Sequence, residues 1–284
     1  MDHKIQKQSR EKPSSEVGVR RRDLRRRSVR SIVDLVERDS RLWRLPPSAA
    51  LIIAAIPILI VLGMVATVPF PDFFVWITAE DSLLEWLQFL LLLAASLIFA
   101  WSGFLLLRSH RGKIGFLFLL VALGAFFVAG EEIAWGQRIF GWSTPESLEA
   151  VNSQQETTLH NIYSAHPIFV YSMMLVGLYG VLMPIFASIW WNKKQESILH
   201  RLLIPPLCLV PAFFMPFGYR FSRLALGVDA LFPKLIFVIT KFSEVTEVCL
   251  YFALLVFAWL NLHSIQWRGP SRARQFNSEN NRNQ

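Results

Sequence analysis

One apolar segment of this chain ends on two adjacent carboxylates. Residues 114–130 contain no acidic or basic side chain, and Glu131 and Glu132 follow them directly in the sequence GEEIAWGQR. Acidic groups at the edge of a membrane-spanning helix are costly and often functional. Two neighbouring carboxylates can serve as general acid and base, or bind a hard divalent metal ion. This motif is therefore the first place where the chain could do chemistry.

Further acids stand at the start of two other apolar segments. They are Glu80, Asp81, Glu85, Glu244 and Glu247. A polar segment, 141–166, carries Glu156 and His160 four residues apart, on one face if that part is helical. If successive apolar segments cross a membrane in alternate directions, these five acids share one depth of the outer leaflet with Glu131 and Glu132. We expect a single acidic pocket, covered by the histidine-bearing loop.

So many like charges in a pocket of low dielectric need compensation. One possibility is a divalent metal bound by Glu132, Glu156 and His160, although the chain contains no HExxH motif. A second is ion pairing, because Arg138 would share a face with Glu131 if the helix continued through the motif. A third is protonation, which would give a chain of coupled carboxylates.

These residues lead to three alternative functions. A metal-assisted enzyme acting on a lipid or lipid-linked substrate would use as catalytic residues Glu85, Glu131, Glu132, His160 and Glu247. Its substrate-binding residues would be Trp135, Gln137, Arg138 and Asn161, with Arg138 holding a phosphate. The alternatives are an ion- or proton-coupled transporter, and an assembly or scaffold subunit in which the charges only fix helix packing.

The elements that must position these residues are predicted to be membrane helices. Of 284 residues, 53% are hydrophobic, and the apolar segments approach the roughly 20 residues that cross a bilayer as a helix. We predict an all-α, polytopic helical membrane protein with about six transmembrane helices. The expected spans are about 49–68, 82–107, 114–130, 167–191, 202–219 and 242–262.

Two local patterns qualify this prediction. Four prolines lie within 202–219, so that span should be kinked or broken. Thr144 before Pro145 predicts a short helix in the external loop 141–166, with Leu148 and Val151 facing inward.

The net charge of +8 is distributed by side of the membrane. Twenty-four of the twenty-nine Lys and Arg residues fall in both terminal regions and in two alternate loops. This positive-inside pattern predicts an inner (cytoplasmic) membrane protein of a bacterium with both termini in the cytoplasm. No nucleic-acid-binding module accompanies the charge, so we expect no nucleic-acid partner.

The flanking regions are expected to differ from the transmembrane domain at 47–264. Residues 1–18 and 265–284 are polar and are predicted to be disordered tails. Residues 19–46 space apolar side chains among many arginines, which indicates a basic amphipathic helix on anionic membrane lipids; an orientation-setting tail is the alternative.

Four motifs lie within about 79–165: EDSLLEW, GEEIAWGQRIFG, TPESL and QETTLHN. In this combination the chain resembles an uncharacterised family of bacterial multi-pass membrane proteins that carries a G-E-E-I-x-W-G-Q-R motif. The resemblance implies a bacterial inner-membrane protein, and it implies no reaction. It also implies one site formed by Glu80, Asp81, Glu85, Glu131, Glu132, Trp135, Gln137, Arg138, Glu156, His160 and Asn161. The chain is also similar to alkaline-ceramidase-like membrane hydrolases, which use intramembrane Ser, Asp and His side chains around zinc. It departs from them because it has no paired histidines four residues apart in its last span and has Glu where they use His.

Overall fold

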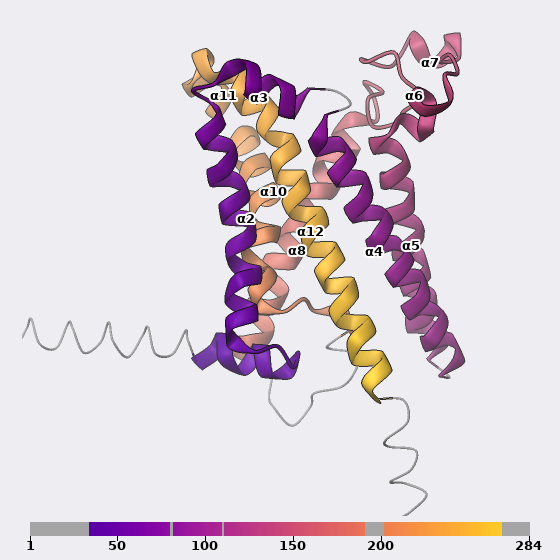
Figure 1. The fold of residues 1–284 in the computed structure, drawn as a ribbon, viewed down its shortest axis with the longest axis vertical. Helices are drawn as coiled ribbons and strands as arrows, with labels where there is room; N and C mark the ends of the chain where they lie inside the picture. Colours follow the sequence, from indigo (N-terminus) through magenta and orange to yellow (C-terminus); the bar gives the residue numbers. More distant parts are fainter. Residues whose placement is uncertain (1–33, 80–81, 110, 191–201, 269–284) are drawn as a thin grey trace, which may run out of the picture.

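The computed structural model describes residues 34–79, 82–109, 111–190 and 202–268 (Figure 1). Within these ranges the chain is all-α and forms no β-strand, as predicted. The long helices are α2 (Pro47–Thr67), α4 (Leu83–Arg108), α5 (Gly112–Glu132), α8 (His166–Trp190) and α12 (Ile236–Arg268). All five are apolar and long enough to cross a membrane.

Shorter helices connect the long ones. They are α3 (Pro71–Thr78), η1 (Ala134–Gly136), α6 (Gln137–Phe140), α7 (Glu146–Glu149), η3 (Leu207–Leu209), α10 (Val210–Ala225), α11 (Val228–Leu231) and η4 (Pro233–Leu235). The segment with α6 and α7 lies at the end of the bundle where α5 ends and α8 begins (Figure 1).

The predicted span at 202–219 differs from the structure. Pro206 is extended, with φ −70° and ψ 155°, and a 3₁₀ turn follows before α10 begins at Val210. α10 has 16 residues, or about 24 Å at 1.5 Å per residue, which is shorter than a hydrocarbon core of about 30 Å. The part of the chain that the structure describes therefore has five long apolar helices, and the expected break in the remaining segment is present.

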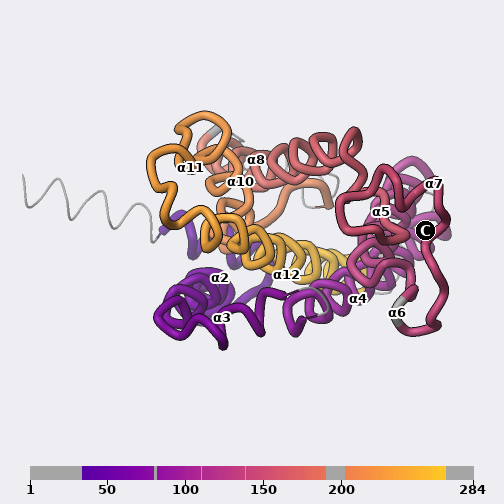
Figure 2. Tube along the Cα trace, turned by 90° about the horizontal axis from the view of Figure 1, so that it is seen from above, coloured from indigo at the N-terminus to yellow at the C-terminus, as the bar shows by residue number. Residues whose placement is uncertain are grey.

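Helix α12 runs through the middle of the bundle (Figure 2). It packs against α4, α2 and α10, while α8 lies on the far side of α10. The backbones of α8 and α10 approach closely at Gly177 of α8. A Cβ at this position would lie 2.8 Å from the carbonyl oxygen of Phe213 in α10. The bundle therefore has α4 and α5 on one side of α12 and α8 and α10 on the other.

The α4–α5 pair is held by small residues. Ala125 and Ala129, two small residues four apart on α5, are both buried. A Cβ on Gly103 of α4 would lie 2.9 Å from the carbonyl oxygen of Gly115 in α5. The Ser96 hydroxyl adds a hydrogen bond of 2.8 Å to the carbonyl of Ala122.

The basic segment is described only from residue 34. Residues 34–42 are helical, Trp43 is buried against Phe257, and the Asp39 carboxylate accepts a hydrogen bond from the Leu207 amide at 2.7 Å. Part of this segment thus packs into the bundle. The first predicted tail and residues 269–284 of the second lie outside the described residues, and α12 continues to Arg268, past the expected boundary at 264.

Candidate functional site

Helix α5 stops within the GEEIAWGQR motif. After Glu132, the backbone takes positive φ at Ala134 (44°), Trp135 (55°) and Gly136 (81°), and α6 begins in a new direction. The prediction that Arg138 shares a helical face with Glu131 is therefore wrong. The side chain of Arg138 lies outside the described part of the structure, so its expected phosphate contact stays a prediction.

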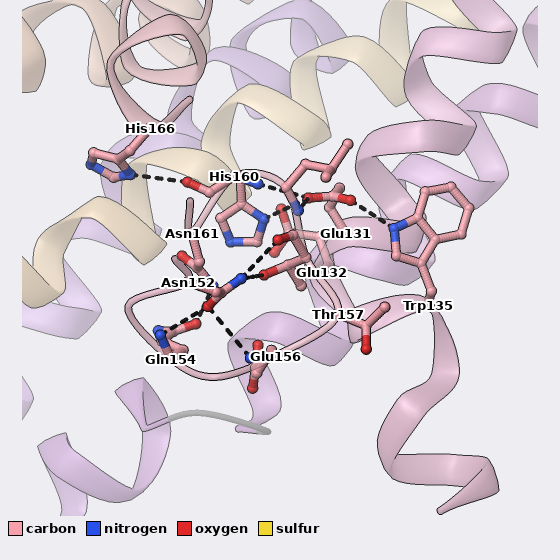
Figure 3. A network of polar contacts seen from close by, with 12 residues as sticks. Glu131, Glu132, Trp135, Asn152, Gln154, Glu156, Thr157, His160, Asn161 and His166 are labelled. Atoms are coloured by element: carbon pink, nitrogen blue, oxygen red, sulfur yellow. Dashed lines mark hydrogen bonds and ion pairs between the residues drawn. The ribbon is translucent and has the colours of Figure 1, made fainter. Parts of the chain in front are cut away.

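The turn brings four donors to Glu131 (Figure 3). Its carboxylate accepts hydrogen bonds from the Trp135 indole at 2.6 Å and from the Leu159 and His160 amides at 2.6 and 2.9 Å. The His160 imidazole completes the set at 3.1 Å. Glu131 is buried, so these contacts satisfy a charge that water does not reach. It fixes the loop to the end of α5.

The same contacts determine how His160 titrates. Burial disfavours the charged imidazolium, but the ion pair with Glu131 outweighs that effect and raises the pKa of His160 above its usual value. Glu247 and Glu244 add to the rise from a longer distance.

Trp135 and Gln137 position the loop. The indole of Trp135 lies against Gly130, where a Cβ would come within 2.8 Å of the ring. Gln137 donates to the Thr144 hydroxyl and accepts from the Thr157 amide, both at 2.8 Å. Neither Trp135 nor Gln137 lines the cavity described below, so the structure does not support their predicted contact with a substrate.

The rest of the loop is organised by Asn152, which the sequence did not single out. Its buried amide donates to the Thr158 carbonyl at 2.7 Å and accepts from the Gln154 amide at 2.9 Å (Figure 3). Helix α7 begins at Glu146, one residue later than the predicted start at Pro145. Val151 is 43% exposed, so it does not face inward as expected.

Glu132 of α5 and Glu247 of α12 have different hydrogen-bond partners. The Tyr251 hydroxyl donates to Glu132 at 2.9 Å, and Arg220 donates to Glu247 at 2.8 Å. Tyr251 and Arg220 are both buried. Tyr251 follows Glu247 by four residues in the sequence, so the two share one face of α12. The pairing of Arg220 with Glu247 could not be predicted from the sequence, because it depends on where α10 lies.

A polar cavity of about 510 Å³ lies between the loop and the bundle. We call it the chamber. Seven of the predicted site residues line it: Glu85, Glu131, Glu132, Glu156, His160, Asn161 and Glu247. Glu244, Arg220 and Lys241 line it as well. Glu80 and Asp81 lie outside the described residues. The chamber thus contains the expected gathering of carboxylates from α4, α5 and α12.

The predicted metal set is not supported. Among the residues that the structure describes, no three His, Cys, Asp or Glu side chains gather closely enough to bind a metal ion, so Glu132, Glu156 and His160 form no such group. Two of the three side chains have other partners: the Nδ1 atom of His160 is hydrogen-bonded to Glu131, and the carboxylate of Glu132 accepts a hydrogen bond from Tyr251.

An apolar cavity of about 440 Å³ lies below the chamber, between α5 and α8. We call it the groove. A small cavity of about 50 Å³ lies between the two. It shares Glu132, His160, Arg220 and Glu247 with the chamber, and Val128, Phe169 and Met173 with the groove. This small cavity, the junction, is where a polar space meets an apolar one.

No protein-family model, curated protein or solved structure matches this chain. Its function therefore has to be inferred from the chamber, the junction and the groove.

Proposed function

We propose that this protein is a membrane enzyme that acts by acid–base chemistry on a lipid or lipid-linked substrate. The observation that carries the proposal is the junction. A lipid with its headgroup in the chamber and a chain in the groove would place the bond that joins them beside Glu132 and Glu247. Carboxylates so placed can transfer protons to and from that bond.

The two carboxylates are assigned different roles because their partners differ. Arg220 favours the ionised form of Glu247 and orients it, which suits a general base that takes a proton from an attacking water molecule, so that the bond to water forms as the bond to the leaving oxygen breaks. Among the residues that the structure describes, the hydrogen-bond partner of Glu132 is the uncharged Tyr251 hydroxyl, which suits a group that donates a proton to the leaving oxygen. His160 and Glu131 hold the loop over the reacting groups. No step in this scheme passes through a metal ion.

The charge of the chamber favours certain headgroups. Six carboxylates line it, namely Glu85, Glu131, Glu132, Glu156, Glu244 and Glu247, whereas its basic lining residues are Arg220, Lys241 and two histidines. A headgroup that carries an amine or several hydroxyl donors complements this surface better than a bare phosphate does.

We further propose that the chamber faces outward from a bacterial inner membrane and that both termini are cytoplasmic. The support is the distribution along the sequence of basic residues, which concentrate in the terminal regions and in the segments that follow α4 and α8. The basic segment before α2 is proposed to contact anionic lipid.

The test is turnover of lipid by the purified protein in vesicles of bacterial total polar lipid, followed by mass spectrometry. We expect one lipid species to be converted, and the Glu132→Gln and Glu247→Gln variants to be slower by about 100-fold or more. Glu149→Gln is the matched control, because Glu149 is exposed on α7 and does not line the chamber.

Unchanged lipids with the folded wild-type protein would contradict the enzyme. Movement of an intact lipid between leaflets, lost in Glu247→Gln, would indicate a transporter instead. A co-purifying protein whose binding depends on the same carboxylates would indicate a scaffold.

A further inference from the structure

We propose that the groove between α5 and α8 binds a single hydrocarbon chain of a membrane lipid, and that the Tyr179–Leu203 contact at its lower end limits the length of that chain. This inference rests on the proposed function for the position of the headgroup. It adds the class of substrate: an amphiphile with one chain engaged and a defined maximum length.

The lining of the groove is suited to hydrocarbon. It is formed mainly by aliphatic and aromatic side chains of α5, α8 and α12, and none of its described lining residues is charged. The hydroxyls in the lining belong to Ser172, Tyr179 and Tyr251, and two of these are engaged: Tyr251 with Glu132, and Tyr179 with the Leu203 carbonyl. An apolar cavity of this kind is favourable for a chain and unfavourable for a polar ligand.

The groove has the length of one leaflet. Between Phe169 near the junction and Tyr179 at the far end, α8 advances ten residues, or about 15 Å at 1.5 Å per residue. That is about half of a hydrocarbon core of about 30 Å. At about 30 Å³ for a group the size of a water molecule, the volume of the groove holds on the order of 15 methylene-sized groups, which is one chain rather than two.

At the far end of the groove a hydrogen bond joins α8 to the segment that precedes α10. The Tyr179 hydroxyl donates a hydrogen bond of 2.8 Å to the carbonyl of Leu203, in the segment that precedes α10. Leu203 and Pro205 line this end. Leu203 ends a short helical stretch, and the chain becomes extended at Pro206. The Leu207 amide donates to Asp39, so the Leu203 carbonyl is left to accept from α8. Tyr179 and Leu203 form the floor of the groove.

The occupant is a lipid chain for two reasons. First, the groove lies at the depth of membrane-spanning helices, where hydrocarbon chains are the solvent. Second, the junction shares lining residues with both the groove and the chamber, so a molecule that fills both is apolar at one end and polar at the other. A peptide would bring unpaired backbone groups into the groove.

Gly124 provides a direct way to fill the groove. It lines the groove on α5, and a Cβ there would meet no atom within 4 Å. Gly124→Phe therefore introduces a ring into the space of the chain from a position where the Cβ itself meets no atom, and it replaces a residue that is unfavourable inside a helix. Gly63→Phe is the matched control, because Gly63 lies inside α2, also faces open space and does not line the groove.

The experiment is native mass spectrometry of the full-length protein with lysophosphatidylethanolamines, whose single chains range from decanoyl to stearoyl. For the wild type we expect binding to rise with chain length and then to fall by about tenfold once the chain exceeds the groove. Tyr179→Ala should move this limit to longer chains. Gly124→Phe should weaken binding by about tenfold or more, and Gly63→Phe should bind as the wild type does.

Equal binding by the Gly124→Phe and Gly63→Phe variants would overturn the proposal, as would a length limit that Tyr179→Ala does not move. If Gly124→Phe does not fold, Val121→Phe, one turn below on α5, tests the same space. Binding with the expected limit but without turnover would refute the enzyme and leave the groove assignment intact. Turnover that Gly124→Phe does not affect would refute the groove assignment and leave the enzyme intact.

Discussion

Glu131 and Glu132 are neighbours in the chain and differ in their tasks. Glu131 receives four hydrogen bonds, three of them on one oxygen from Leu159 and His160 of the loop, so it positions the loop. Glu132 has one partner, Tyr251, and lines the junction. An i, i+1 pair on a helix cannot point the same way, which is why a single motif supports both a structural and a chemical role.

The attachment of the loop should depend on pH through His160. Its pKa is raised by the pairing with Glu131, so the stabilisation is complete below the usual value of about 6.5 and is lost as pH rises through the raised value. We expect the Leu159 and His160 amides to exchange several-fold faster above that range, after correction for intrinsic exchange. Hydrogen–deuterium exchange with mass spectrometry measures this.

The controls separate the ion pair from general loosening. His160→Gln should remove the pH dependence, whereas His166→Gln should retain it, because His166 contacts the carbonyl of His160 and not Glu131. Protection that is equal across the pH range in the wild type would show that the ion pair does not hold the loop.

At this scale the sequence predicted which acids gather but not how they are neutralised. The acidic residues could be placed because they interrupt apolar segments at matching ends. Arg220 could not be assigned to Glu247, since their pairing depends on the side of the bundle that α10 occupies. Trp135 could not be assigned to Glu131, because nothing in its residue type predicts a positive φ.

At the level of the elements, Asp39 joins the helix at 34–42 to η3, because its carboxylate accepts a hydrogen bond from Leu207. Burial raises the pKa of Asp39 from 3.8 to about 6, and the hydrogen bond from the Leu207 amide only partly offsets this. A carboxylate with a raised pKa destabilises the folded state as pH rises from about 4 through about 6, and the cost is constant above that range.

Asp39→Asn should therefore stabilise the protein at neutral pH. The amide keeps an oxygen that accepts from Leu207, so we expect a gain of about 1–2 kcal/mol at pH 7 or above and none near pH 4. Unfolding in mixed micelles at several pH values measures it, with the exposed Asp34→Asn as the control. A loss of stability at neutral pH would mean that a charged carboxylate is needed to accept the hydrogen bond from Leu207, the first residue of η3.

Apolar length and composition predicted four of the long helices to within two residues, since each is an uninterrupted run that must satisfy its backbone internally. The fifth, α12, extends six residues beyond the predicted span at each end. The same criteria failed for α10, where prolines shorten the helix and leave an extended segment. They also failed at the end of α5, because the turn there is stabilised by contacts to residues about thirty positions away.

In the whole molecule, the loop 141–166, which contributes to the lining of the chamber, lies at one end of the bundle, and the turn between α4 and α5 lies at the other (Figure 1). Single-cysteine labelling tests the proposed orientation, because the native Cys208 and Cys249 are buried. In intact cells a membrane-impermeant maleimide should label Glu149→Cys in α7 but not Lys113→Cys in α5. The reverse result would place the chamber on the cytoplasmic side.

The central claim is that one lipid occupies the chamber, the junction and the groove at once. The most direct test is a cryo-electron microscopy map of the full-length protein in nanodiscs of bacterial polar lipid. We predict continuous density from beside Tyr179, past Gly124, to a headgroup between Glu132 and Glu247, and its loss in Gly124→Phe. Lipid density confined to the outer surface of the bundle, with side chains filling the groove, would contradict the claim.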